Sequence, residues 1–260
     1  SGADIETITG ISVVGEGEHV VYVWLRDAAG NRDHLQRTTT TLRYDNTAPA
    51  SPITLTASPA GWSNVNAFDL SWTNPSSAAP IAGAYYKLDS PPGSPTDGGL
   101  IAGVDIHALS DVPVAGAGAH AAYVWLRDEA GNVDHTHRAQ TSLYYDNELP
   151  TGPTVFTSTS HVVATWSSDN TIEVNWSGAA DAHSGIGGYA LVWDRNPTTL
   201  PAAVTTTIDT SATSPALGSG NDHYAHLRTV DNAGNWTNGT WHLGPFYIHS
   251  SAPGAPINLT

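Results

Sequence analysis

Two kinds of side chain alternate along the segment Tyr22–Asp33, which reads YVWLRDAAGNRD. Successive side chains of a β-strand point to opposite faces, so this period of two predicts a strand. One face of the strand is aliphatic, and the other carries Tyr22, Trp24 and Arg26. The letters AAGN that follow predict a tight turn, because glycine adopts a positive φ and asparagine tolerates the left-handed region. A second strand is expected to begin directly after the turn.

The segment recurs twice along the chain. Tyr123–Asp134 reads YVWLRDEAGNVD, and His226–Thr237 is a looser copy, HLRTVDNAGNWT. The aliphatic face is kept in all three copies, whereas the opposite face becomes more polar in the third. Recurrence after about a hundred residues indicates tandem domains of ordinary size.

Alternation and turn residues predict further strands within one repeat. The expected strands are Ile53–Ala57, Ala67–Trp72, Ala84–Leu88, Ile101–Leu109, Ala121–Arg127 and Val133–Tyr145. About seven short strands in a hundred residues, separated by turns rich in proline and glycine, are typical of a β-sandwich.

Three segments carry a resemblance to a known family: SGIGGYALVWD (Ser184–Asp194), HLRTVDNAGNWT and LGPFYI (Leu243–Ile248). They resemble the fibronectin type III-like and immunoglobulin-like repeats of bacterial surface and secreted proteins. The resemblance implies an all-β fold of tandem Greek-key β-sandwiches, joined by proline-containing linkers, and a location outside the cell or on its surface.

The two ends of the chain set the expected domain boundaries. Ala252–Thr260, APGAPINLT, matches Ala48–Thr56, APASPITLT, and the chain begins halfway through a repeat. We therefore expect the C-terminal half of a repeat, two complete repeats and the first strand of a further one. The corresponding ranges are 1–48, 49–149, 150–251 and 252–260.

Composition narrows the classes of function. The net charge is −15, from 24 acidic and 9 basic residues, which leaves no basic tract for a nucleic-acid backbone. There is no cysteine, which excludes disulfides and thiolate chemistry, and no apolar run long enough to span a membrane. Neither a nucleophile motif nor a phosphate loop occurs, and the carboxylates recur with the repeat, so we expect no enzyme.

The DxAGN turns have two interpretations. In the first, each aspartate accepts backbone N–H groups across its own turn and no cofactor is bound. In the second, carboxylate and amide oxygens bind Ca²⁺, which prefers such ligands. The Ca²⁺ candidates are Asp27, Asn31, Asp33, Asp128, Asn132 and Asp134. The third copy has Thr237 in place of the last aspartate, which favours the turn.

The aromatic face of the repeated strand has three interpretations: packing under a neighbouring loop, an interface between subunits, and a platform on which sugars stack. Tryptophan, tyrosine and arginine are enriched at interface hot spots. The interface candidates are Tyr22, Trp24, Arg26, Tyr123, Trp125, Arg127 and, from the last strand, Pro256, Ile257 and Leu259. The simplest role of Trp62, Trp72, Trp166 and Trp176 is in the core, and that of His19, His120 and His223 is packing at equivalent strand entries.

These features predict a structural protein, a repeat segment of an extracellular bacterial filament, sheath or surface stalk. Its partner would be further copies of the same chain, held by sandwich contacts and, in a stronger form, by strand complementation. The alternative is an adhesin or a carbohydrate-binding accessory module, with a polysaccharide as partner.

Overall fold

The computed structural model describes residues 5–254 of the 260-residue chain. Every regular element among these residues is a β-strand, and this part of the chain holds no helix. The strands are β1 (Gly17–Arg26), β2 (Arg32–Tyr44), β3 (Ile53–Ser58), β4 (Trp62–Ser63), β5 (Phe68–Thr73), β6 (Ile81–Leu88), β7 (Gly99–Ala102), β8 (Ala108–Val112), β9 (Gly118–Asp128), β10 (Ala139–Tyr145), β11 (Val155–Ser158), β12 (Trp166–Ser167), β13 (Glu173–Ser177), β14 (Ile186–Asp194), β15 (Ser211–Thr213), β16 (Gly220–Asp231) and β17 (Trp241–Ile248). The all-β fold expected from the sequence is confirmed.

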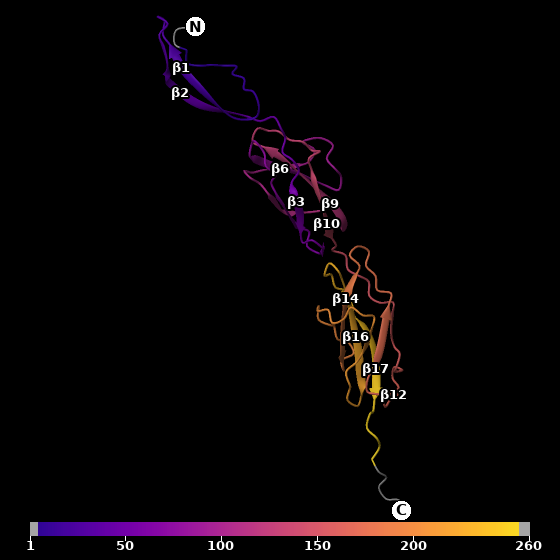
Figure 1. Cartoon of the computed structure of the whole chain (residues 1–260). Coiled ribbons are helices and arrows are strands. Elements are labelled where there is room, and N and C mark those ends of the chain that lie inside the picture. Colours follow the sequence, from indigo (N-terminus) through magenta and orange to yellow (C-terminus); the bar gives the residue numbers. More distant parts are fainter. Residues whose placement is uncertain (1–4, 255–260) are drawn as a thin grey trace, which may run out of the picture. The chain divides into compact units, whose positions relative to one another are not determined.

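Strands β1 and β2 form an antiparallel hairpin that pairs with no other strand of the described residues (Figure 1). Tyr22 lies opposite Thr39 and Trp24 lies opposite Arg37. A lone hairpin buries little apolar surface, which is why isolated hairpins are marginally stable in water. Leu25 and Leu35 accordingly remain exposed.

Two sheets account for residues 53–145. One has the order β3-β5-β8, and the other has the order β4-β10-β9-β6-β7. Strand β5 buries every second residue, Phe68, Leu70 and Trp72, as the period of two requires of a sheet with one inward face. Val124 and Leu126 of β9 are also buried. The sheets together form a β-sandwich.

Residues 155–248 repeat this arrangement. The sheet β11-β13-β15 corresponds to β3-β5-β8, and β12-β17-β16-β14 corresponds to the five-stranded sheet without its last strand. In both sheets the two-residue strand is parallel to its neighbour, and the long pairs are antiparallel. The core of this second sandwich consists of Ile172, Val174, Trp176, Tyr189, Ala225, Leu227, Phe246 and Ile248.

Two predicted strands differ from the structure. The expected strand Ile101–Leu109 is interrupted, because residues 103–107 form a turn in which Asp105 has a φ of +53°. The expected strand Val133–Tyr145 begins only at Ala139. Val133 forms an isolated antiparallel bridge with Arg127, but the residues after it bond elsewhere. Asp134 accepts the N–H of Thr136, and the ring of His137 bonds to the carbonyl of Pro49.

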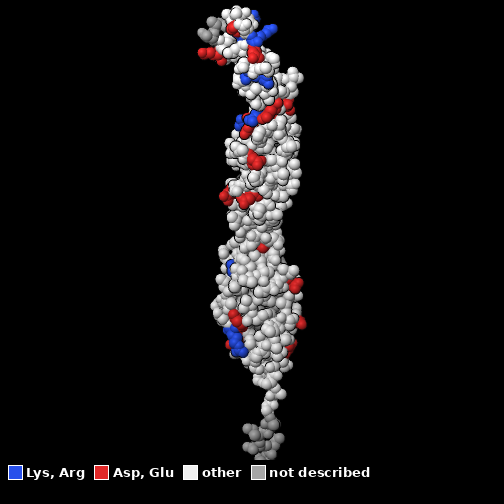
Figure 2. Space-filling model, turned by 60° about the vertical axis from the view of Figure 1, so that its left-hand side comes forward, with Lys and Arg blue, Asp and Glu red and all other residues white. Residues whose placement is uncertain are grey.

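The chain divides into two compact units. The first extends to Ala57 and includes Asp69–Ser110 and Ala121–Ser142, and the second comprises Ser58–Phe68, Asp111–His120 and the chain from Leu143. The domain boundaries expected from the sequence stay a prediction. On the face drawn in Figure 2 charged side chains are sparse. Several cations are paired with carboxylates, as in Arg43–Glu18 and Arg195–Asp222.

Candidate functional site

The DxAGN turn has the same geometry in all three copies. Both oxygens of Asp27 accept hydrogen bonds from Asn31, one from its backbone N–H and one from its side-chain amide, each at 2.8 Å. Asp128 and Asn132 repeat this pair, and so do Asp231 and Asn235. The glycine before each asparagine has a φ between +93° and +94°, a conformation that strongly favours glycine.

The electrostatics of the turn follow from this geometry. The pKa of the Asp27 carboxyl lies below its ordinary value, first because of the side-chain amide of Asn31 and then because of its backbone N–H. The later candidate, Asp33, accepts the N–H of Leu35 instead. Asp134 accepts from both the N–H and the hydroxyl of Thr136, which lowers its pKa. All four carboxylates named for Ca²⁺ thus serve local turns, and Ca²⁺ binding by them stays a prediction.

The asparagine of the turn has a further contact that the sequence did not reveal. In the first unit, Nδ2 of Asn132 also donates to the backbone carbonyl of Asp45, at 3.1 Å. Asp45 lies in the segment between β2 and β3, so one side chain holds both its own turn and this linker. The carboxylate of Asp45 accepts the N–H of Ala79 at 2.8 Å and that of Thr47 at 3.0 Å.

The second linker, in the second unit, is held in the same way. Nδ2 of Asn235 donates to the carbonyl of Asp146 at 2.8 Å, and the Asp146 carboxylate accepts the N–H groups of Ser184 and Glu148. We call each set, Asp45 with Asn132 and Ala79, and Asp146 with Asn235 and Ser184, a linker clamp. The aspartate that recurs in the YDN letters of both linkers therefore bonds through its backbone and its side chain together.

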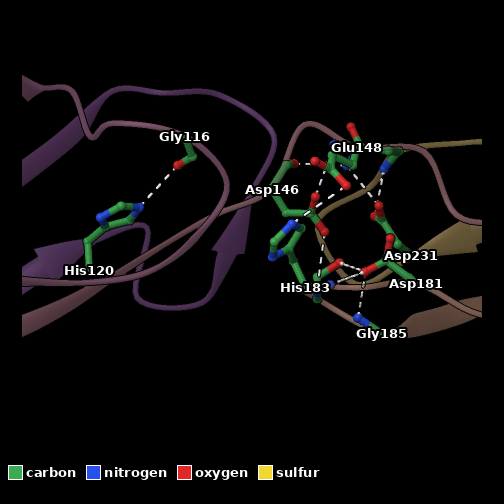
Figure 3. Close-up of polar contacts among 10 residues, drawn as sticks. Gly116, His120, Asp146, Glu148, Asp181, His183, Gly185 and Asp231 are labelled. Atoms are coloured by element: carbon green, nitrogen blue, oxygen red, sulfur yellow. Dashed lines mark hydrogen bonds and ion pairs between the residues drawn. The ribbon is translucent and has the colours of Figure 1, made fainter.

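Three carboxylates converge at the second linker clamp. Asp146, Asp181 and Asp231 each bring an oxygen to within 4.8 Å of the other two, as Figure 3 shows. They are well supplied with donors: Asp181 alone accepts the backbone N–H groups of Ser184 and Gly185 at 2.8 and 2.9 Å. Burial raises the pKa of the Asp181 carboxyl, but these donations outweigh it and leave the pKa below its ordinary value.

Such a group of carboxylates has the ligand type that a hard cation prefers. The first linker clamp, however, offers only Asp45 and Asp128, because residues 76–79 read SSAA where the second has Asp181. The hydrogen bonds of the clamp are nevertheless the same in both. Linker geometry therefore does not depend on the third carboxylate. The sequence could not indicate this cluster, since its members lie 35 and 50 residues apart.

The aromatic strand has a different environment in each copy. Trp125 of β9 is fully buried, its ring stacks on Tyr85 at 5.4 Å, and its indole N–H donates to the carbonyl of Pro95 at 2.8 Å. The loop over it approaches so closely that a Cβ on Gly98 would lie 2.6 Å from the Trp125 ring. The environment of Trp125 therefore matches one of the three interpretations of the aromatic face, packing under a neighbouring loop.

The same face is open in the hairpin β1–β2. Tyr22 and Trp24 are 50% and 47% exposed, and Arg26 is exposed as well. Arg37 lies over the Tyr22 ring at 5.2 Å, as Arg138 lies over the ring of half-buried Tyr123 at 5.9 Å. Arg127 is half-buried. The remaining interface candidates, Pro256, Ile257 and Leu259, lie outside the described residues.

The tryptophans expected in the core divide into two pairs. Trp72 and Trp176 are buried, as predicted. Trp62 is only half-buried and Trp166 is 60% exposed, so their placement in the core was wrong. The reason is that β4 and β12 are two-residue strands at sheet edges, where each tryptophan lies against a tyrosine of the neighbouring strand. The ring centroids of Trp62–Tyr144 and Trp166–Tyr247 are 5.3 Å apart in both sandwiches.

Each of the three equivalent histidines makes the same kind of hydrogen bond. Nε2 of His19, His120 and His223 lies 2.9, 3.0 and 2.7 Å from the carbonyl of Gly15, Gly116 and Gly218, respectively. Figure 3 includes the pair of His120 and Gly116. Each ring thus closes the turn that precedes its strand, which is a structural role repeated with the domain.

No protein-family model and no curated protein sequence matches the chain. Among solved structures, it is similar to the FN1–FN3 domains of chicken CNTN1, with 12% identity over 87% of this chain and 76% of that one, at a TM-score of 0.37. It is also similar to the fibronectin(III)-like modules of Clostridium thermocellum CbhA, with 13% identity over 78% of this chain and 99% of that one, at a TM-score of 0.40. Because both TM-scores are low, the β-sandwich fold is assigned from the sheets of this chain and not from these similarities. The described residues include no helix that could span a membrane.

Proposed function

We propose that the chain is a structural repeat segment of an extracellular bacterial filament, sheath or surface stalk. The observation that carries the proposal is the linker clamp, which is built twice from equivalent residues. A catalytic or ligand site is normally unique in a chain, whereas a contact repeated at every linker is what a linear array of modules needs. The proposal includes no catalytic activity.

The clamp suits a load-bearing or spacing role. A linker without contacts behaves as a flexible coil, and the modules it joins move independently. Here the linker residue is held by its backbone carbonyl and by its carboxylate at the same time. Pro49 and Pro150, which follow the two clamps, are buried and restrict φ further. We infer that the linkers are stiff.

Self-association would use the open hairpin. Its aromatic face carries Tyr22, Trp24 and Arg26, all exposed, whereas on the equivalent face of strand β9 Trp125 is buried and Tyr123 and Arg127 are half-buried. Aromatic residues beside arginine are the composition of interface hot spots. Strand complementation needs a refinement, because β3, the counterpart of residues 252–260, pairs with β5 and not with the strands that correspond to the hairpin. A donated strand would therefore have to meet a counterpart of β5.

Imaging tests the filament. Negative-stain micrographs of native surface material that contains the chain should show filaments with a periodicity of one sandwich repeat. Trp24→Ser in the open hairpin should reduce lateral or longitudinal association, and Trp166→Ser, also an exposed tryptophan, serves as the matched control. Isolated particles with no filaments in native material would contradict the proposal.

The alternative is an adhesin or a carbohydrate-binding accessory module, and one observation favours it. Trp166 is 60% exposed beside Tyr247, and exposed aromatic rings can stack on sugar faces. Affinity electrophoresis in gels that contain polysaccharide measures this directly. Retardation lost in Trp166→Ser and kept in Trp24→Ser would support carbohydrate binding, and equal mobility in all gels would contradict it.

A further inference from the structure

The second sandwich contains a histidine pair that has no counterpart in the other repeats. His226 of β16 lies directly opposite His242 of β17, and their Nδ1 atoms are 2.6 Å apart. In the earlier copies the position of His226 is occupied by Tyr22 and Tyr123. The DxAGN turns, the linker clamps and the strand-entry histidines recur with the repeat, as structural features do. A polar pair that does not recur is therefore a candidate for a role other than a structural one.

A carboxylate fixes the orientation of the buried histidine. Oδ1 of Asp194, on the neighbouring strand β14, lies 3.0 Å from Nε2 of His226. The Asp194 carboxylate is held in turn by the hydroxyl of Thr199 at 2.6 Å and the N–H of Asn196 at 2.9 Å. A carboxylate accepts hydrogen bonds, so we assign the His226 proton to Nε2. Its Nδ1 lone pair then points at His242.

The two rings differ in freedom. His226 is completely buried, and the ring of Tyr224 stacks beside it at 6.0 Å, so its position is set by packing. His242 is exposed and can turn about its side-chain bonds. One ligand is thus preset and the other is open to solvent, which gives an ion both a fixed coordination point and a path of entry.

We propose that Nδ1 of His226 and Nδ1 of His242 bind one divalent transition-metal ion of the Cu²⁺, Ni²⁺ or Zn²⁺ class, with water in the remaining positions. Neutral imidazole suits these ions, and a carboxylate on the far nitrogen of a histidine ligand is the usual orienting partner. Metal–nitrogen distances near 2.0–2.1 Å require the two Nδ1 atoms to separate to about 3 Å, which a rotation of His242 supplies. The proton on Nδ1 of His242 moves to its Nε2. Asp194 is a positioning residue in this site.

Calorimetric titration of the full chain with Ni²⁺ and with Cu²⁺, in a non-coordinating buffer, tests the site. We expect one ion per chain and tighter binding of Cu²⁺ than of Ni²⁺. His242→Gln should lower the affinity by more than about tenfold, and Asp194→Asn by about tenfold. His249→Gln, an exposed histidine of the same sandwich, is the matched control and should bind as the unmodified chain does.

Electron paramagnetic resonance of the Cu²⁺ complex gives a readout that a purely structural role would not move. The unmodified chain should show two coordinating nitrogens, and His242→Gln should show one. The melting temperature of metal-free His242→Gln reports whether this variant folds. If it does not fold, the loss of affinity expected for Asp194→Asn tests the site instead. Binding of equal affinity in His242→Gln, binding lost equally in His249→Gln, or no stoichiometric ion in the unmodified chain would each overturn the proposal.

Discussion

Asn235 carries more structure than its place in a turn suggests. It is buried, and its side chain donates to the Asp146 carbonyl and to the Asp231 carboxylate, both at 2.8 Å. Replacement by alanine leaves a buried carbonyl and a buried carboxylate oxygen each short of a donor. An unsatisfied buried polar group costs about 1–3 kcal/mol.

We therefore expect Asn235→Ala to lower the free energy of unfolding of the second sandwich by about 1–3 kcal/mol. Urea denaturation, followed by the intrinsic tryptophan fluorescence of the chain, measures the change. Asn238→Ala is the matched control, because Asn238 is exposed and lies three residues further along the same loop. Equal midpoints for the two variants would show that the linker contact contributes nothing.

Asp181 makes stability depend on pH. Its pKa in the folded chain lies below the ordinary value of 3.8, because the backbone N–H groups of residues 183–185 outweigh burial. The unfolded chain then binds protons at a higher pH than the folded chain does. The stabilisation is present above pH 3.8 and is lost as the pH falls through the lower, folded pKa.

We therefore expect the melting temperature of the second sandwich to fall as the pH is lowered below about 4. In Asp181→Asn this fall should be smaller, and the variant should already be less stable at pH 7. Asp209→Asn, which alters an exposed carboxylate of the same sandwich, should keep the full pH dependence. Differential scanning calorimetry between pH 2.5 and 7 compares them, and parallel profiles for all three chains would refute the assignment to Asp181.

At the scale of elements, equivalent strands carry the same tryptophan in opposite environments. Trp125 of β9 is 0% exposed and bonded to Pro95, whereas Trp24 of β1 is 47% exposed. Removal of a buried tryptophan side chain leaves a cavity and costs about 3–5 kcal/mol. We expect Trp125→Ala to lower the free energy of unfolding of the first sandwich by about 3–5 kcal/mol. Trp24→Ala should change the free energy of unfolding of the first sandwich by less than about 0.5 kcal/mol.

Hydrogen exchange of the amides of β6 and β9 measures both variants site by site. Loss of protection in Trp125→Ala alone is the expected result. Similar losses in both variants would mean that the hairpin is packed in solution and that its aromatic face is not open.

The strands and turns that were predicted correctly are those that leave a pattern in neighbouring residues. The period of two located β5 and β13 with their buried tryptophans, and the DxAGN letters located three turns whose glycines have positive φ. The exposure of Trp166 was missed because a strand of two residues has no period to read. The late start of strand β10 was missed because His137, which lies just before the strand, bonds to the carbonyl of Pro49, 88 residues earlier in the chain.

The candidate sites depend on contacts between distant residues and were therefore largely invisible in the sequence. The repeat did indicate that Asn132 and Asn235 matter, but it could not show that their second amide hydrogen reaches a linker 87 or 89 residues earlier in the chain. The pairing of His226 with His242 depends on the register of β16 and β17, which no local pattern fixes.

At the scale of the whole molecule, the proposed function requires that successive sandwiches keep a fixed relation through the linker clamp. The chain has no cysteine, so two introduced cysteines can be spin-labelled without background. Thr73 of β5 and Thr213 of β15 are exposed strand positions, one in each sandwich. A clamped linker should give one narrow distribution of label-to-label distances, because the carbonyl of Asp146 is held by Asn235.

Asn235→Ala in the labelled chain should broaden this distribution, since a linker released from its donors samples many conformations. Asn238→Ala should leave it unchanged, which separates release of the linker from a general effect of mutating the loop. Double electron–electron resonance in frozen solution records the distributions. A broad distribution in the unmodified chain, or one that Asn235→Ala does not alter, would mean that the modules are flexibly tethered. The stiff spacer on which the filament proposal depends would then have to be abandoned.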